Sequence, residues 1–494
     1  MRHHSPDLWN PPHHQMQSNF SAVLLGNLND FIAPGQACVN PIFVDPTPPP
    51  SSSGGVVKKR VELSFDFAAG DELLMDTKST KGLIKLDNKS NAAKVSLSDC
   101  LACSGCVTTA ETVLLKAQSV SEFLQTMEGI RNQTSDKYST ACVTLAPQVL
   151  ASLATRFNTS VQVTQAKLYG FLKQVCGVDS VLDASGLASY LSQLEVAKEF
   201  VARYRAMANS ERLLLPMLSS SCPGWVCYAE KTLGRQVLDH LSEIRSPQQV
   251  AGILLKSKLA RVYHVSIMPC PDKKLEASRT EFKRLDGEDA EVNCVLTATE
   301  LCDLLVNFYG DLDGAFANLP VNSNSSLTPL EVEFGGNVEE RFAGNSGSLC
   351  AFVFRYACRE LFGVDLPADA ALPFKRGRNA DTWTLELEME GRTVLNFATS
   401  YGFRNIQEVG RKVRHGLLKA HFVEVMACPS GCVNGGGLVQ TVDNKKELTD
   451  RVTKALDSWP RTLPFTTPSS FPKLTTTFND IKHAAPANEL MQEW

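Results

Sequence analysis

The sequence predicts an α/β fold with parallel sheets, and three observations lead to this prediction. First, 43% of the 494 residues are hydrophobic, which is enough to bury large cores in several domains. Second, short apolar runs alternate with longer stretches of helical periodicity between about residues 140 and 459, as in parallel strands joined by helices. Third, three of these runs lead into a Cys-Pro pair, which predicts ligand-binding groups at the carboxyl ends of strands.

The charge balance and the cysteine count restrict the classes of function. The formal net charge of −4, from 49 basic and 53 acidic residues, offers no basic field for nucleic acid or an anionic membrane, so we expect neither as a partner. No apolar run approaches the roughly 20 residues of a membrane span, and we expect a cytoplasmic protein. Thiols stay reduced there, so the fifteen cysteines are interpreted as metal ligands and buried thiols rather than disulfides.

Changes in composition divide the chain into four segments. Residues 1–60 form an N-terminal arm and a linker rich in Pro, Ser and Gly, and they carry Cys38. Residues 61–139 form a small cysteine-containing domain, residues 140–459 the α/β domain, and residues 460–494 a tail rich in Thr and Pro. The strands predicted within the α/β domain are residues 142–145, 213–218, 262–268, 292–296 and 422–426.

The first cysteine group is the sequence SDCLACSGCV, which contains Cys100, Cys103 and Cys106. Two-residue spacers allow a loop to wrap so that successive thiolates point at different corners of one iron–sulfur cluster. A structural zinc site is the main alternative, although zinc loops usually pair two distant C-x2-C motifs. A fourth ligand must come from elsewhere, and Cys38 is the only cysteine N-terminal to the triple. Spacing alone leaves an ordinary buried thiol as the other interpretation of Cys38.

The second group consists of cysteines that follow predicted strands. Cys222, Cys270 and Cys428 each precede a proline at the end of an apolar run, and Cys432 lies four residues after Cys428. Since these strand ends line one crevice in open α/β sheets, we expect the four thiols to converge. A Gly-Gly-Gly run at 435–437 lacks the Lys-Ser/Thr of a phosphate loop and is expected to allow close packing beside the site. The cysteines expected to be buried core thiols are Cys142, Cys176, Cys227, Cys294, Cys302, Cys350 and Cys358.

These motifs resemble iron-only hydrogenases and, more closely, the hydrogenase-like proteins of the eukaryotic cytosolic iron–sulfur assembly machinery. The sequences SCPGW, MPCPDKKLE and EVMACPSGCVNGGG are similar to the three hydrogenase signatures, and the resemblance covers most of the chain. It implies an iron-only hydrogenase-like fold, with two parallel-sheet α/β lobes around a buried cluster. In that family Cys222, Cys270, Cys428 and Cys432 hold the four-iron four-sulfur (4Fe–4S) cubane of the active site.

The N-terminal motifs are similar to those of the assembly branch. LNDFIAPGQACV and LSDCLACSGC look like the segments that hold an N-terminal cluster in that branch. The resemblance therefore implies that Cys38, Cys100, Cys103 and Cys106 hold a second 4Fe–4S cluster, with residues 61–139 as a ferredoxin-like iron–sulfur domain.

One departure separates the two branches. Hydrogenases have Cys-Cys-Pro in the first signature, where the first thiol donates protons, and Ser221 stands at that position here. A serine hydroxyl is far too weak an acid to replace a thiol near neutral pH. Lys273 and Glu276 match the second signature and suggest a retained polar pocket, the alternative being a solvated helix start.

The resemblance implies a non-catalytic adaptor that delivers clusters to cytosolic and nuclear apo-proteins. Its partners would be early scaffold NTPases, apo iron–sulfur proteins and the late targeting complex. The segment 492–494, ending in Trp494, is similar to the tripeptide by which clients dock onto the WD-repeat propeller of that complex. The alternatives are a hydrogenase or related redox enzyme, and a nuclear protein that binds prenylated lamin tails.

Overall fold

The computed structural model describes most of the α/β domain. The described residues are 23–25, 93–95, 117–184, 186–208, 215–282, 289–321, 328, 330–331, 348–367, 370–439 and 445–457. Cys38, Cys100, Cys103, Cys106 and Trp494 lie outside them. The chain forms two units, and in the unit Ala22–Val107 strand β1 (Val23–Leu25) pairs antiparallel with β2 (Ala93–Val95). The features below belong to the other unit.

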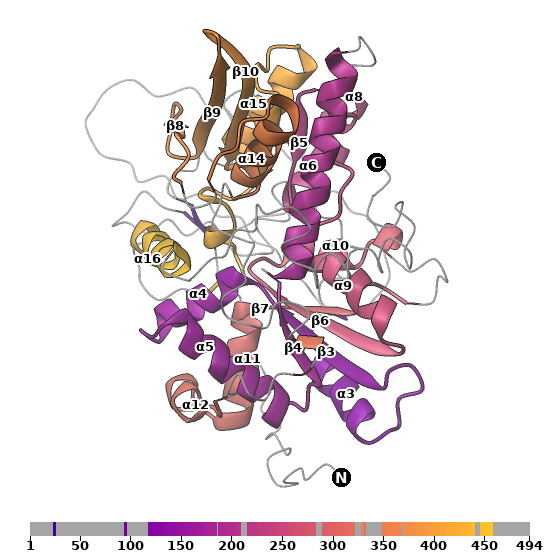
Figure 1. Ribbon diagram of the computed structural model, residues 1–494. Helices are drawn as coiled ribbons and strands as arrows, with labels where there is room; N and C mark the ends of the chain where they lie inside the picture. Colours follow the sequence, from indigo (N-terminus) through magenta and orange to yellow (C-terminus); the bar gives the residue numbers. More distant parts are fainter. Residues whose placement is uncertain are drawn as a thin grey trace, which may run out of the picture. The chain divides into compact units, whose positions relative to one another are not determined.

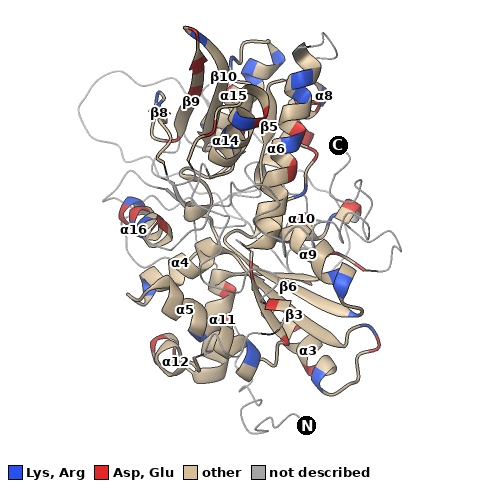
Figure 2. Cartoon of the chain, in the orientation of Figure 1, with Lys and Arg blue, Asp and Glu red and all other residues tan. Residues whose placement is uncertain are grey.

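The first lobe is built on a four-stranded, fully parallel sheet (Figure 1). We call it the four-stranded lobe. The strands lie in the order β4 (Ser180–Asp183), β3 (Thr140–Leu145), β6 (Val262–Met268) and β7 (Cys294–Thr297). Every residue of β6 is buried, because helices cover both faces of a sheet of this kind. Strands β3 and β6 carry no charged side chain, and charges lie mainly on helices and loops (Figure 2).

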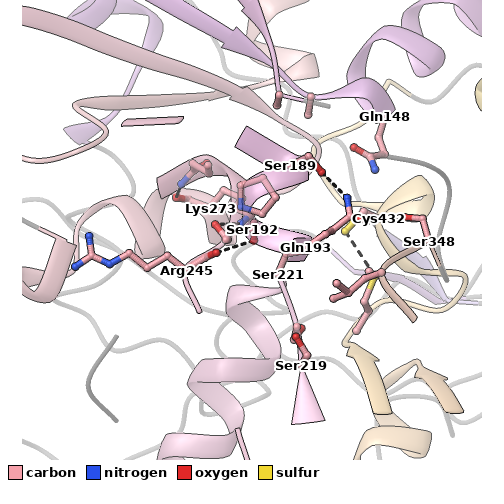
Figure 3. Close-up of a pocket in the computed structure, with 18 of the residues that line it drawn as sticks. Gln148, Ser189, Ser192, Gln193, Ser219, Ser221, Arg245, Lys273, Ser348 and Cys432 are labelled. Carbon is pink, nitrogen blue, oxygen red and sulfur yellow. Dashed lines mark hydrogen bonds between the residues drawn. The ribbon is translucent and has the colours of Figure 1, made fainter. Parts of the chain in front are cut away.

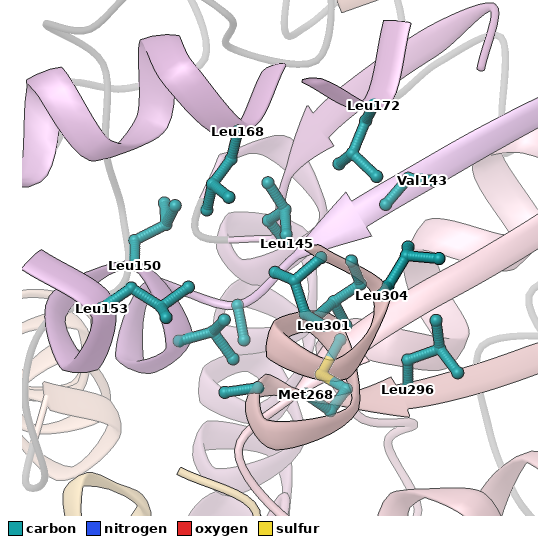
Figure 4. Packing of buried hydrophobic residues seen from close by; sticks show 14 of the residues in the cluster. Val143, Leu145, Leu150, Leu153, Leu168, Leu172, Met268, Leu296, Leu301 and Leu304 are labelled. Atoms are coloured by element: carbon teal, nitrogen blue, oxygen red, sulfur yellow. The ribbon is translucent and has the colours of Figure 1, made fainter. Parts of the chain in front are cut away.

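The two faces of this sheet have separate cores. Strand alternation directs Val143 and Leu145 of β3 toward α4 (Pro147–Arg156), α5 (Val161–Gly170) and α11 (Ala298–Tyr309), and Figure 4 shows their leucines packed together. Cys142 of the same strand belongs to the core on the opposite face. That core includes side chains of α9 (Pro247–Lys258) and of the start of α6 (Leu187–Ala208).

Shorter elements complete the four-stranded lobe. Helix α5 continues directly into a π-helical turn. A capping box begins α11, in which Thr297 and Glu300 bond each other's backbone N–H groups. The remaining elements are α3 (Val120–Arg131), η3 (Phe171–Val175), α10 (Asp272–Ala277), η5 (Thr280–Phe282), α12 (Leu312–Asn318) and α16 (Lys445–Asp457).

The second lobe is built on a five-stranded mixed sheet, and we call it the five-stranded lobe. Its order is β5 (Met217–Ser219), β11 (Phe422–Met426), β10 (Arg392–Tyr401), β9 (Thr382–Met389) and β8 (Lys375–Arg376). The first three strands are parallel to one another, β9 runs antiparallel to β10, and β8 runs antiparallel to β9. The hairpin between β9 and β10 turns at Glu390 and Gly391, whose φ angles of 51° and 74° are those that a type I′ turn requires.

An aromatic cluster forms the core of the five-stranded lobe. The ring of Phe397 on β10 lies 5.0 Å from that of Phe422 on β11 and 4.8 Å from that of Phe200 on α6. Phe354 of α14 (Ser348–Phe362) lies 5.2 Å from the same ring. Helices α6 and α14 therefore cover this face of the sheet. The other helices of this lobe are α7 (Pro223–Tyr228), η4 (Ala229–Leu233), α8 (Arg235–Leu238) and α15 (Phe403–Arg414), with the turn η7 (Gly431–Asn434).

The predicted α/β class with parallel sheets is confirmed, with one correction. The strands at 262–268 and 422–426 have the predicted bounds, while the strand predicted at 213–218 is the shorter β5. The second sheet is mixed rather than wholly parallel, because β9 pairs antiparallel with β10 and β8 pairs antiparallel with β9. No helix in the described ranges has the length and apolarity that crossing a membrane demands.

Replacement of Phe397 by Ala should destabilise the five-stranded lobe strongly. The side chain is fully buried and touches three other rings, so its loss leaves a cavity worth about 3–5 kcal/mol of unfolding free energy. Urea unfolding followed by tryptophan fluorescence measures the change. The control is Leu417→Ala, whose side chain is 58% exposed and should shift the free energy by less than about 0.5 kcal/mol. Equal effects of the two substitutions would contradict the assignment of this core.

Candidate metal centre

Three strand ends deliver the second cysteine group. Strand β5 ends three residues before Cys222, β6 ends two residues before Cys270, and β11 ends two residues before Cys428. Strands β5 and β11 are parallel neighbours in the five-stranded sheet, so their ends lie at the same edge. Strand β6 belongs to the other sheet. The candidate site therefore combines cysteines from both lobes.

Helix starts fix the orientation of two of these cysteines. Cys222 is the N-cap of α7, and Pro223 takes the first helical position, where a missing N–H costs nothing. The backbone N–H of Cys222 donates to Ser220 Oγ at 3.0 Å. Cys270 is followed by Pro271, the N-cap of α10. Each Cys-Pro pair thus marks the end of a strand and the start of a short helix.

The electrostatics of the thiols indicate that they lie near one another. Burial raises the pKa of the Cys270 thiol, and Asp272, Cys428 and Cys222 raise it further. Burial likewise raises the pKa of Cys432 to about 12, with a smaller contribution from Cys222. Such mutual effects fall off with distance, so the four sulfurs share one neighbourhood. Without a bound cation the thiols of Cys222, Cys270 and Cys432, whose pKa values are all raised, stay protonated near neutral pH.

The donor set fits an iron–sulfur cluster. Among the residues with described positions, no three His, Cys, Asp or Glu side chains are close enough to hold one metal ion. In a cubane each cysteine binds a different iron, so its ligands stand farther apart than those of one zinc ion. Four soft thiolates are also the ligand type that iron–sulfur clusters require. When bound, a cluster supplies iron, sulfide and a site for one-electron exchange.

Glycines allow the cysteine loops to pack against each other. A Cβ on Gly435 would lie 2.3 Å from the carbonyl oxygen of Pro269, so only glycine fits there. Gly437 N–H donates to the same oxygen at 2.9 Å, and Thr299 N–H, in the first turn of α11, donates to the carbonyl of Gly437 at 3.1 Å. The loop that follows Cys432 is thereby held beside Cys270. The close packing predicted for residues 435–437 is confirmed.

A cavity of about 130 Å³, with both apolar and polar residues in its wall, lies between the lobes beside Cys432 (Figure 3). Ser219, Ser221 and Lys273 line it together with Gln193 and Arg245. Part of the wall is held by hydrogen bonds, from Gln193 Nε2 to Ser189 Oγ at 2.9 Å and from Ser192 Oγ to the Arg245 carbonyl at 2.8 Å. Met426 also faces the cavity, with its sulfur 3.8 Å from that of Cys432.

Lys273 and Glu276 form a buried ion pair rather than a solvated helix start. Lys273 Nζ donates to Glu276 Oε2 at 2.8 Å and to Ser246 Oγ at 3.1 Å. The other carboxylate oxygen of Glu276 accepts from Ser246 Oγ at 2.5 Å and from the side-chain amides of Gln248 and Gln249. The lysine is thus fixed at the cavity wall with its charge balanced.

Ser221 faces the cavity and also a smaller one of about 20 Å³ that Cys222 and Cys227 border. The hydroxyl occupies the place where the hydrogenase signature has a thiol, and no other thiol replaces it in the sequence between β5 and Cys222. Cys227, expected as a core thiol, is buried and borders the smaller cavity.

The sequence did not reveal several residues of the cavity wall. Gln193 lies on α6 and Arg245 on the segment before α9, each far in sequence from a cysteine motif and without a signal of its own. The other cysteines expected in the core are buried within the described part of the chain; they are Cys142, Cys176, Cys294, Cys302, Cys350 and Cys358.

Comparisons with known proteins agree with this arrangement. Residues 139–436, which include all four strand-end cysteines, match the family "Iron only hydrogenase large subunit, C-terminal domain". The chain is 40% identical to the cytosolic Fe-S cluster assembly factor narfl of Xenopus tropicalis over 88% of both chains. It is 41% identical to the cytosolic iron-sulfur assembly component 3 of Rattus norvegicus, again over 88% of both chains.

Solved structures show the same fold. A variant of the FeFe-hydrogenase HydA1 from Chlamydomonas reinhardtii superposes with a TM-score of 0.61 at 24% identity. The match covers 75% of this chain and 98% of the hydrogenase. This likeness shows the fold. The match to the family model and the two relatives show that the chain belongs to the iron-only hydrogenase-like family, in the branch that contains these cytosolic iron–sulfur assembly factors.

Proposed function

We propose that the chain is a cytosolic iron–sulfur cluster assembly factor that carries two 4Fe–4S clusters without catalysing a redox reaction of its own. The observation that carries the proposal is the strand-end cysteine set beside a cavity in which Ser221 replaces the proton-donating thiol. The names of the 40% identical relatives support the assembly role. The hydrogenase-like fold alone would be compatible with either role.

In this proposal the strand-end site holds the protected cluster. Cys222, Cys270, Cys428 and Cys432 are its ligands, and the prolines after three of them stiffen the loops. The glycine contact with Pro269 keeps the loops together. Ser221 cannot deliver protons near neutral pH, and Lys273 is held by Glu276, so the surrounding residues retain a cluster rather than turn over a substrate.

The N-terminal site holds the second cluster in this proposal. Cys38, Cys100, Cys103 and Cys106 are its ligands, on sequence grounds alone. The adaptor would receive clusters through early scaffold NTPases and pass them to apo-proteins of the cytoplasm and nucleus. Contact with the WD-repeat subunit of the targeting complex would involve Trp494.

Anaerobically purified protein should contain about eight irons and eight sulfides per chain. Cys428→Ala removes a ligand of the strand-end site and Cys100→Ala a ligand of the N-terminal site, so each should lower both contents by about half. Iron and sulfide assays with EPR spectroscopy measure the change. Cys358→Ala is the control, since that thiol is buried in the core of the five-stranded lobe, on α14, and belongs to neither proposed site. Zinc without sulfide would refute the cluster assignment.

Depletion of the protein in cells should lower the activities of cytosolic and nuclear iron–sulfur enzymes while mitochondrial ones persist. Expression of the wild type should restore the activities, and Cys428→Ala should not. A variant that lacks residues 492–494 should keep its iron but restore activity less well, because docking on the targeting complex is lost. Enzyme assays in the same extracts measure each outcome. Full activity of the cytosolic and nuclear iron–sulfur enzymes after depletion would contradict the assembly role.

A hydrogenase is the second candidate, and the retained cavity of about 130 Å³ is the observation that favours it. We expect that the anaerobic protein neither consumes nor produces hydrogen and shows no infrared bands of iron-bound CO or cyanide. A hydrogenase prepared in parallel serves as the positive control. Hydrogen turnover together with these bands would contradict the adaptor proposal and show that the protein is an enzyme.

A further inference from the structure

Three arginines lie exposed at the edge of the five-stranded sheet. They are Arg376 at the end of β8, Arg378 in the loop to β9, and Arg404 in the first turn of α15. None of the three guanidinium groups has an ion pair or hydrogen bond to another residue of the described structure. Figure 2 shows basic residues on both β8 and α15. We call Arg376, Arg378 and Arg404 the arginine surface.

Two asparagines bring the elements of this surface together. Asn379 Nδ2 donates to Asn405 Oδ1 at 2.9 Å, and Asn405 Nδ2 donates back to Asn379 Oδ1 at 3.3 Å. Arg378 and Arg404 each immediately precede one of these asparagines, so the two arginines start from adjacent backbone. Arg376 stands opposite the half-buried Trp383 in the β8–β9 pairing.

The loop that carries the surface is held in a single conformation by its own hydrogen bonds. Gly377 N–H donates to the Thr382 carbonyl at 2.7 Å, and a side chain at this glycine would collide with Thr382. Asp381 N–H donates to Asn379 Oδ1 at 3.0 Å, and Trp383 Nε1 donates to the Ala380 carbonyl at 2.9 Å. A partner that binds here loses little entropy in ordering the loop.

The same loop contacts the cysteine motif. Asp381 Oδ1 accepts a hydrogen bond of 2.6 Å from the backbone N–H of Ser430, between Cys428 and Cys432. Gly402, just before α15, has a φ of +83° and lies against Pro429. A protein bound to the arginine surface would therefore sit next to the loop that supplies two candidate cluster ligands.

Local charge favours an acidic partner. Lys375 is paired with Glu386 at 2.8 Å. The Asp381 carboxylate keeps its charge beside the neutral Ser430 N–H and Glu388 adds a second one, so the three arginines, which have no ion pair in the described structure, outnumber these two carboxylates. The chain as a whole carries −4, so the edge reverses the sign of the molecule. Arginine and tryptophan are the side chains most enriched in protein interfaces. Three arginines flanked by carboxylates are a small footprint for nucleic acid, which needs a broader basic field.

We infer that the arginine surface docks a carboxylate-rich face of a partner protein beside the Cys428–Cys432 loop. The contact itself does not depend on cluster transfer; its purpose, to bring an acceptor or donor of clusters to the strand-end site, rests on the proposed function. Electrostatic attraction of this kind steers association and weakens as salt is added.

Fluorescence anisotropy with a fluorescein-labelled polyglutamate peptide tests the inference on the full-length, anaerobically purified protein. At about 50 mM salt, the variant Arg376→Glu, Arg378→Glu, Arg404→Glu should bind about tenfold more weakly than the wild type. The matched control is Arg235→Glu, Arg392→Glu, Arg414→Glu, which makes the same charge change at exposed arginines elsewhere and should alter the Kd less than about twofold. Carbodiimide coupling of the peptide should label Lys375, the amine nearest the surface in sequence.

The outcomes separate this inference from the proposed function. Unchanged iron content in both variants, with weaker binding in the first alone, supports the docking surface. Equal weakening in both variants, absence of binding by the wild type, or coupling only at other lysines would overturn it. A single-stranded oligonucleotide that binds the same surface more tightly than polyglutamate would also overturn the assignment to a protein partner. Loss of the clusters from the wild type with binding retained would refute the proposed function alone.

Discussion

The cost of ionising buried thiols governs the centre of this protein. Burial raises the pKa values of Cys222, Cys270 and Cys432, and the charge of Cys222 raises those of Cys270 and Cys432 further. A bound cation is needed to offset the cost of ionising these thiols together. The strands of both lobes must therefore end close together, so that the cysteines that follow them lie at one site. Parallel pairing of β5 with β11, and the separate parallel sheet that contains β6, accomplish this arrangement.

The parts of the fold predicted from sequence are those with a strong local signal. Strand β6 is a continuous apolar run, and its bounds were predicted to the residue because both faces of a parallel sheet are buried. Strands β9 and β10 were missed, since β9 alternates Thr and Glu with apolar residues and β10 interrupts its apolar residues with Asn, Thr and Ser, so neither is a continuous apolar run. The short β4 was missed as well, because four residues give too little periodicity to detect.

The candidate site divides in the same way. The cysteine-proline pairs at strand ends can be identified from the sequence, and so can Ser221 beside Cys222. The cavity wall does not, because Gln193 and Arg245 reach it only through the packing of α6 and of the segment before α9 between the lobes. The burial of Lys273 and Glu276 could not be predicted either, because a lysine and a glutamate three residues apart on a short helix have the same sequence pattern in solvent and in a core. Tertiary packing, not local pattern, decides such positions.

The glycine contact at Pro269 has a consequence beyond the fit of two loops. Gly437 donates to Pro269 through its N–H and accepts from the first turn of α11 through its carbonyl, so one residue of the Cys432 loop joins the five-stranded lobe to a core helix of the four-stranded lobe. The two lobes are therefore mechanically linked at the same few atoms that border the cysteines. Any event that displaces the Cys432 loop also removes a backbone acceptor from the start of α11, so the integrity of the four-stranded core depends on the state of the loop that supplies the ligands.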